Sequence, residues 1–295
     1  MRFMAVPILL CLFCFCLTSE QLKTLSEFTS NQDMKEGLQL AGKAADAMRD
    51  FTPKEEYYLG RAVAATIMTR YPPATRIESF NSYLNLMGQF LVMFSPKPYL
   101  FKGYTFAVLD NDTLINAYAS PGGHVLITSG LIRLCHTEDE LAAVLAHEIG
   151  HICRQHALSA ISKSKRLDFF KSMLKFAGRK AGEKYLNEDL KELTNIFDGF
   201  VGAISQKVLN GFSVDQEDEA DSLALIILQD AGYAPSAMIS FIECLPQHLE
   251  GHYKAHRSPA KRKELVEKII AANSLMGKLE PERKSRFQKM VRVLQ

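Results

Sequence analysis

The sequence predicts an α+β fold, mainly helical, with one small antiparallel β-sheet. Apolar residues recur at helical spacing over most of the chain, between capping and breaking signals. Only residues 104–128 have short β-branched or aromatic runs separated by turn residues, which is typical of short strands. The next helical segment carries two histidines four positions apart. We therefore expect a helical scaffold around a small sheet, with the candidate site on the helix that follows the sheet.

The composition is that of a globular protein. Hydrophobic residues make up 47% and charged residues 23% of the 295 residues, which excludes a disordered or fibrous chain. The formal net charge is +2, and there is no dense basic stripe with interleaved aromatic residues. The sequence therefore gives no support for a nucleic-acid partner.

Residues 1–19 have the pattern of a signal peptide, because one positive charge at Arg2 precedes an apolar run that is short for a membrane span. We expect cleavage after Thr18 or Ser19, and lipid modification of Cys16 stays open as an anchored alternative.

Three of the six cysteines lie in this leader. The other three, Cys135, Cys153 and Cys244, do not form a disulfide framework, and a bridge between Cys135 and Cys153 stays open.

Residues 20–98 are predicted to form a helical extension. Thr52, Pro53 and Glu55 combine an N-cap, a proline at the first helical position and a capping-box glutamate. The two prolines within residues 95–98 end this region. We expect the main domain at residues 99–275 and a C-terminal helix at residues 276–295.

The main domain is predicted to begin with strands at residues 104–109, 114–119 and 124–128. A capping box formed by Thr137 and Glu140 opens a helix expected to end near His156.

Amphipathic helices follow between residues 159 and 209, and Ser213 caps a further helix that runs to Leu228. Phe169, Phe170 and Phe176 leave a peripheral membrane contact open, although packing of these side chains in the core is the simpler interpretation.

His147, Glu148 and His151 form the motif His-Glu-x-x-His. Four residues of helix place both imidazoles on one face, one turn apart, so that both rings can reach one metal ion. Glu148 then flanks the metal and can take a proton from a bound water, which is its role in metalloproteases with this motif.

A third ligand is needed, and position 157 is alanine, which excludes an arrangement with a third histidine six residues after His151. His156 is one residue too early, and we interpret it as a helix-end histidine or as a partner of a ligand. A carboxylate from the helix after Ser213 is the remaining option.

Glu217 and Asp221 share one face of that helix, whereas Glu219 points elsewhere. Glu217 can bind the metal, and Asp221 can accept the other ring N–H of a metal-binding histidine. Two histidines, one carboxylate and an open fourth position predict one catalytic Zn²⁺ per chain.

With these motifs in place, the sequence resembles the HtpX and CAAX-prenyl-endopeptidase superfamily of zinc peptidases, in particular its soluble periplasmic branch of the BepA and LoiP type. The resemblance covers roughly Phe101 to Val266. The segments that carry it are Asn116 to His124, Glu140 to His151, Ser213 to Asp221 and His256 to Arg262.

The resemblance implies a zincin-like fold in which His147, His151 and Glu217 bind zinc, as in gluzincins. It also implies that Glu148 is the catalytic acid and base, and that the Asp221 carboxylate contacts one of the metal-binding side chains.

The segment from Asn116 to Thr128 resembles the edge strand that lines the cleft, where an extended substrate adds as another strand. The expected substrate-binding residues are therefore Asn116, Ala117, Tyr118 and His124, and an ordinary strand side chain is the alternative for His124.

His256 resembles a late histidine of the family and is expected to approach the metal, either to stabilise the oxyanion or to close a resting site. The alternative is a loop histidine before a helix capped by Ser258. Val214 and Arg257 stand where the family usually has arginine and proline, which affects local packing and the placement of His256.

The resemblance implies a zinc metalloendopeptidase that cleaves misfolded or unassembled envelope proteins in the periplasm, with peripheral outer-membrane association left open. The rival interpretation is a zinc-bound chaperone or assembly factor whose protease activity is latent.

Overall fold

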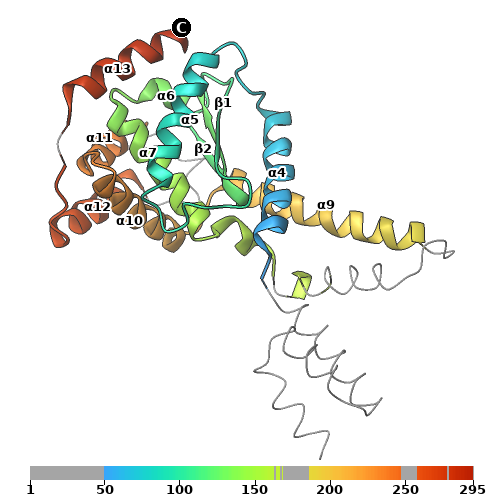
Figure 1. Cartoon of the computed structure of the whole chain (residues 1–295). Helices are drawn as coiled ribbons and strands as arrows, with labels where there is room; N and C mark the ends of the chain where they lie inside the picture. Colours follow the sequence, from blue (N-terminus) through green and yellow to red (C-terminus); the bar gives the residue numbers. More distant parts are fainter. Residues whose placement is uncertain are drawn as a thin grey trace, which may run out of the picture. The chain divides into compact units, whose positions relative to one another are not determined.

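We analysed a computed structural model of the chain (Figure 1). The structure describes residues 50–162, 164–166, 168, 186–246, 258–277 and 279–294. The expected signal peptide, Phe169, Phe170, Phe176 and His256 with Arg257 lie outside the described residues.

The chain divides into two compact units, and everything that concerns the candidate site lies in the unit formed by residues 52–160 and 200–295. The other unit, residues 1–51 and 161–199, contains an ion pair between Arg166 and Asp50 (2.6 Å) and the first part of α9 (Leu186–Asn210).

Two N-terminal helices belong to the same compact unit as the sheet and the histidine helix. Helix α4 (Pro53–Arg70) has the predicted capping box: the Thr52 amide donates to the Glu55 carboxylate (2.8 Å), and the Glu55 amide donates to the Thr52 hydroxyl (3.3 Å). Helix α5 (Glu78–Val92) follows a non-helical segment, in which Pro73 pairs with Leu109 of the sheet. Residue 98, the expected end of the extension, lies within the compact unit of residues 52–160 and 200–295.

The sheet contains β1 (Thr105–Leu109), β2 (Ala117–Ser120) and β3 (His124–Thr128) in the order β1-β3-β2. The prediction of an antiparallel sheet is correct for β2 and β3, which form a hairpin through the 3-10 turn at residues 121–123. It is wrong for β1, which runs parallel to β3.

The connection between β1 and β2 explains this order, because it passes around the carboxyl end of β3. There the Ser129 hydroxyl donates to Asp112 (2.6 Å). Gly130 allows the close approach, since a Cβ atom on it would lie 2.6 Å from the Asp112 carbonyl oxygen. The alternation of apolar residues predicts which face of a strand is buried, but it does not predict which strands lie beside it in the sheet.

The two edges of this sheet differ. At the β1 edge, Asn85 and Asn81 of α5 accept hydrogen bonds from the amides of Phe106 (3.0 Å) and Val108 (3.1 Å). The other edge is β2, which lies beside the histidine helix α7. Helix α5 therefore covers one edge and leaves the other to the candidate site.

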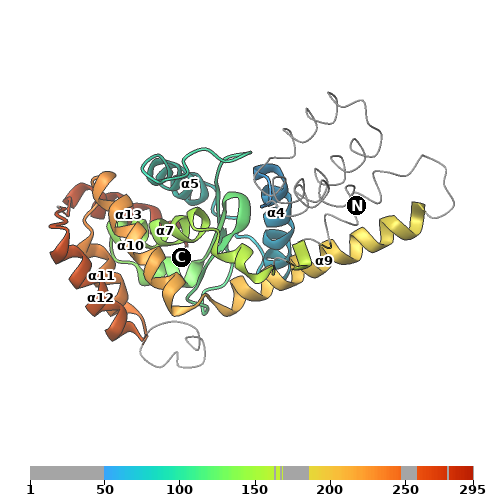
Figure 2. The same ribbon diagram turned by 90° about the horizontal axis from the view of Figure 1, so that it is seen from below.

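Helix α7 (Glu138–Cys153) is the centre of the unit, and every one of its residues is buried. Figures 1 and 2 show α10 (Val214–Asp230), α11 (Ser236–Cys244) and α12 (Pro259–Ala272) on one side of α7, and the sheet with α4 on the other. The short α6 (Ser129–Leu134) joins β3 to α7.

Helix α7 ends three residues earlier than predicted, because Gln155 adopts a left-handed backbone conformation (φ 55°). The Gln155 side-chain amide donates to Glu56 of α4 (3.0 Å), which helps to hold this uncommon conformation. The chain then turns back through a 3-10 helix (His156–Ala160). This reversal decides where the His156 ring lies.

The C-terminal helix α13 (Pro281–Val291), followed by a 3-10 turn (Arg292–Leu294), packs on α7. Its Arg286 pairs with the buried Glu138 at the start of α7. The three cysteines outside the leader, Cys135, Cys153 and Cys244, are all free, so the bridge left open between the first two is absent.

The described residues contain no helix long and apolar enough to cross a membrane. The fold class is as predicted: mainly helical, with one small sheet and a central buried helix.

Candidate metal centre

His147 and His151 stand one turn apart on the same face of α7, as their spacing predicts. Their Nε2 atoms lie 3.0 Å apart. His147 is 8% and His151 3% exposed, so both rings are shielded from bulk water. Two imidazole nitrogens this close together can share one metal ion.

Glu217 comes to the same point from α10. The Ser213–Gln216 capping box begins this helix, so Glu217 lies in its first turn. One carboxylate oxygen of Glu217 is 3.5 Å from His147 Nε2, and the other is 3.4 Å from His151 Nε2. Two helices far apart in the sequence thus bring three ligand groups together.

This donor set fits zinc. The ligand atoms of His147, His151 and Glu217 all lie within 4.8 Å of one another. Tetrahedral bonds of about 2.0–2.2 Å to nitrogen and oxygen require ligand atoms about 3.3–3.5 Å apart. Imidazole and carboxylate are also the ligands that catalytic zinc sites use.

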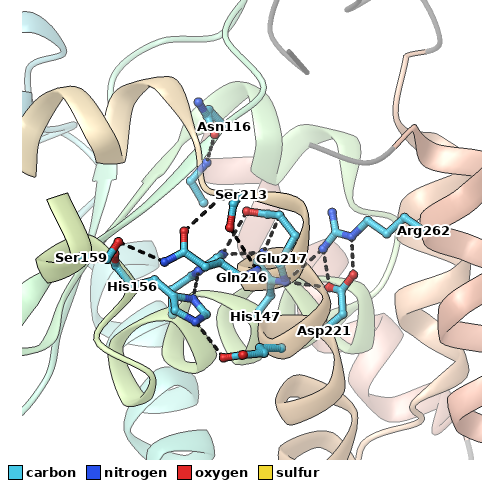
Figure 3. Close-up of polar contacts among 12 residues, drawn as sticks. Asn116, His147, His156, Ser159, Ser213, Gln216, Glu217, Asp221 and Arg262 are labelled. Carbon is cyan, nitrogen blue, oxygen red and sulfur yellow. Dashed lines mark hydrogen bonds and ion pairs between the residues drawn. The ribbon is translucent and has the colours of Figure 1, made fainter. Parts of the chain in front are cut away.

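Asp221 of α10 contacts His147. One of its carboxylate oxygens lies 2.7 Å from His147 Nδ1 (Figure 3). Arg262 of α12 donates to both oxygens of the same carboxylate, from Nε (2.7 Å) and Nη2 (2.6 Å). The Asp221 carboxylate, which is 0% exposed, is therefore paired with both His147 and Arg262.

These charges shift the pKa values of both partners. Burial and Arg262 lower the pKa of His147, but Asp221 and Glu217 outweigh them and raise it to about 9. Burial raises the pKa of Asp221, but Arg262 and His147 outweigh it and hold that pKa well below its usual range. Asp221 therefore stays ionised and keeps its acceptor oxygens directed at the ring of His147.

His151 has a different partner, which is His156. The Nδ1 atoms of the two rings are 2.8 Å apart, and His156 Nε2 is 3.2 Å from a carboxylate oxygen of Glu219. Phe212 stacks on the His151 ring, with ring centroids 4.1 Å apart. Burial, opposed by a hydrogen bond to Glu217, lowers the pKa of His151 to about 3. Zinc binding requires the neutral form of both rings, so it would displace a proton from His147 and none from His151.

The turn that holds His156 is tied to the start of α10. The Ser159 hydroxyl donates to the His156 carbonyl oxygen (2.6 Å), and the Gln216 side chain donates to the Ser159 hydroxyl (3.1 Å; Figure 3). The residues that cap α10 therefore also hold the His156 ring in contact with His151.

Glu148 is 7% exposed and lines the same pocket as the three ligand groups. The pocket walls are otherwise mainly apolar, and its lining side chains include Leu131, Val144, Val208, Met238, Phe241 and Leu245. A carboxylate beside three converging ligand groups in an apolar pocket can accept and return a proton.

The residues expected to bind substrate separate into two groups. Asn116 and Ala117 line the pocket. Tyr118 is 2% exposed and stacks on Tyr71, at the end of α4. His124 Nδ1 lies 2.8 Å from the Thr105 hydroxyl, and neither Tyr118 nor His124 is among the residues that line the pocket.

Two residues of the site, Arg262 and Glu219, were not given these roles from the sequence. The family resemblance includes an arginine that follows a late histidine, so the sequence singled out Arg262. Its contact with Asp221 could not be predicted. Glu219 was expected to point elsewhere and is not among the residues that line the pocket, yet it reaches His156. No local pattern predicts that contact, because it depends on the reversal at Gln155.

Comparison with known proteins agrees with this geometry. Residues 84–290 match the model of peptidase family M48. The chain is 31% identical over 170 residues to the beta-barrel assembly-enhancing protease of Escherichia coli K12, covering 55% of this chain and 32% of that protein.

Two other relatives are similar to this chain. It is 26% identical over 174 residues to the metalloprotease LoiP of Escherichia coli K12 (55% of this chain, 61% of LoiP). It is 27% identical over 161 residues to the mitochondrial metalloendopeptidase OMA1 of Arabidopsis thaliana (53% and 30%).

The chain thus spans about a third of the length of the beta-barrel assembly-enhancing proteases that it matches. The family match, in contrast, extends over more than half of this chain and includes the sheet, α7, α10 and α12. The chain belongs to peptidase family M48.

Proposed function

We propose that the chain is a zinc-dependent endopeptidase in which His147, His151 and Glu217 hold one zinc ion and Glu148 moves the proton. One observation carries this proposal: three ligand groups from two helices converge within 4.8 Å, in the pocket that also contains Glu148.

The chemistry divides between the metal and the chain. A zinc ion in this position would polarise the peptide carbonyl and acidify a water molecule. Glu148 takes the proton of that water and passes it to the nitrogen that leaves. Asp221 and Arg262 keep the His147 ring in place, and the apolar walls keep other water away from the reacting atoms.

We propose that the substrate binds as an added strand at the edge of β2. The Thr128 amide donates to the Asn116 carbonyl (3.0 Å), so the backbone of the next residue, Ala117, faces the opposite edge. Asn116 and Ala117 line the pocket, so an extended peptide paired there would pass Glu148.

The proposed substrates are misfolded or unassembled proteins of the cell envelope. Support comes from relatives whose names refer to β-barrel assembly. Because the match covers about a third of the length of these relatives, recognition of such substrates by this chain is part of the proposal. Export fits the apolar leader, and N-terminal sequencing of the mature protein would test it, with a start after Thr18 or Ser19 expected. An intact leader would contradict cleavage.

Casein and an unfolded outer-membrane protein are suitable test substrates for the full chain. We expect cleavage by the native chain and a fall in kcat of at least about 100-fold in Glu148→Gln, because the proton acceptor is lost. Zinc content should stay unchanged in this variant. Asp215→Asn, on the exposed first turn of α10, is the matched control and should cleave normally.

The same assay distinguishes the chaperone alternative. A chaperone would suppress aggregation of the unfolded protein equally in the native chain and in Glu148→Gln, and neither would cleave it. That result would contradict the proposed function.

A further inference from the structure

We propose that His136, Glu140 and Cys244 form a second site for a divalent cation, which joins the start of α7 to the end of α11. The proposal does not depend on the peptidase function. Glu140 precedes His147 by two turns of α7, or about 10 Å along the helix, so the two groups of ligands are separate.

The distances among these residues suit one ion. His136 Nδ1 lies 3.5 Å from Cys244 Sγ and 3.5 Å from a Glu140 carboxylate oxygen. All three ligand atoms lie within 4.8 Å of one another. Tetrahedral zinc bonds of about 2.3 Å to sulfur and 2.0–2.1 Å to nitrogen require a separation of about 3.5 Å.

The three groups come from separate parts of the fold. His136 precedes α7 and is an exposed side chain, Glu140 is buried in the first turn of α7, and Cys244 ends α11. The Glu140 carboxylate also accepts a hydrogen bond from the His136 amide (2.6 Å). This bond fixes the carboxylate and leaves lone pairs for a metal, because an ionised carboxylate can accept about four bonds.

The chemistry of the ligands favours zinc among the divalent ions. Thiolate and imidazole prefer zinc to magnesium or calcium. When the cation replaces the thiol proton, Cys244 and Glu140 supply two negative charges that balance its charge. Without a cation, burial and the nearby Glu140 and Glu243 raise the pKa of Cys244, so the thiol is protonated. The partial positive charge at the start of α7 opposes a cation, and the two negative ligands offset it.

The position of this site gives it a structural consequence. Leu245, the residue after Cys244, lines the catalytic pocket together with Phe241 and Met238 of α11. A cation held by Cys244 and the start of α7 would fix this end of the pocket wall.

Cobalt titration of the full, chelator-treated chain tests the proposal. A thiolate bound to Co²⁺ gives a near-ultraviolet charge-transfer band, and the ligand group of His147, His151 and Glu217 contains no sulfur. We expect two equivalents of Co²⁺ and this band in the native chain. In Cys244→Ser we expect one equivalent, no band, and an affinity for the second ion that is lower by at least about 100-fold.

His136→Gln provides a second variant whose folding is not in question, since its side chain is exposed, and it should also lose the band. Glu243→Gln is the matched control, because it changes a neighbouring charge without removing a ligand, and it should keep the band. A band that persists in Cys244→Ser would come from another cysteine and would overturn the proposal, as would uptake of Co²⁺ by the native chain without this band. Loss of casein cleavage in Glu148→Gln tests the peptidase function separately.

Discussion

Gly150 of α7 lies against the backbone of Ala220 in α10. A Cβ atom on Gly150 would be 3.0 Å from the Ala220 carbonyl oxygen and 3.2 Å from its Cα atom. The neighbours of these two residues in the sequence are His151 and Asp221. The close crossing of the two helices therefore sets the distance between the histidines and the carboxylates.

Gly150→Val should push α10 away from α7 and lower zinc affinity by about tenfold or more, because the three ligand groups no longer converge. Competition with a chromophoric chelator in a Cys244→Ser background measures this site alone. Gly202→Ala is the control, since nothing lies within 4 Å of its added Cβ atom. If Gly150→Val binds zinc like the unchanged chain, the helix crossing does not determine the site.

Arg262→Gln should weaken both the fold and zinc binding. It leaves the fully buried Asp221 carboxylate without its bidentate partner, which costs about 3 kcal/mol of unfolding free energy. Zinc affinity should fall by about 10–100-fold, because His147 loses part of its support. Arg262→Lys should restore stability in part, since lysine supplies charge without the planar fork. Urea unfolding and zinc competition measure both effects, and unchanged values in Arg262→Gln would contradict this role.

His156→Phe should lower zinc affinity by about 10–100-fold while the protein stays folded. The variant keeps an aromatic ring in place but removes the contact between His156 Nδ1 and His151 Nδ1. Glu219→Gln should have a smaller effect, because an amide still offers an oxygen to His156 Nε2. Equal zinc affinity in His156→Phe and the native chain would show that His151 does not need this partner.

Glu138→Ala should destabilise the protein by about 2–4 kcal/mol without changing its zinc content. The buried Glu138 carboxylate accepts hydrogen bonds from Tyr83 (2.7 Å), Tyr233 (3.1 Å) and Arg286 (2.7 Å). These three partners lie in or beside elements that pack on the start of α7. Thermal and urea unfolding measure the loss, with the exposed Glu282→Ala in α13 as the control. A midpoint unchanged by Glu138→Ala would refute this contribution.

The parts of the fold that were predictable from sequence are those with local causes. The capping residues Thr52, Thr137 and Ser213 gave the starts of α4, α7 and α10 correctly, because each cap satisfies amides within its own first turn. The spacing of His147 and His151 likewise places both rings on one helix face, where the structure has them.

Features that depend on distant contacts were not predictable. The parallel pairing of β1 depends on how residues 110–116 pass Gly130, and the alternation of apolar residues contains no information on that path. The early end of α7 depends on Gln155, whose side chain reaches Glu56 of α4. The partner of Arg262 depends on how α12 packs beside α10. In each case the two contacting residues are distant in the sequence, and no sequence pattern predicts that they meet.

The most direct test of the account is anomalous diffraction at the zinc absorption edge from crystals of the zinc-loaded chain. The account predicts a peak about 2.0–2.2 Å from His147 Nε2, His151 Nε2 and a Glu217 carboxylate oxygen. A map without a peak between these three side chains, or with Glu217 turned away from both rings, would contradict it.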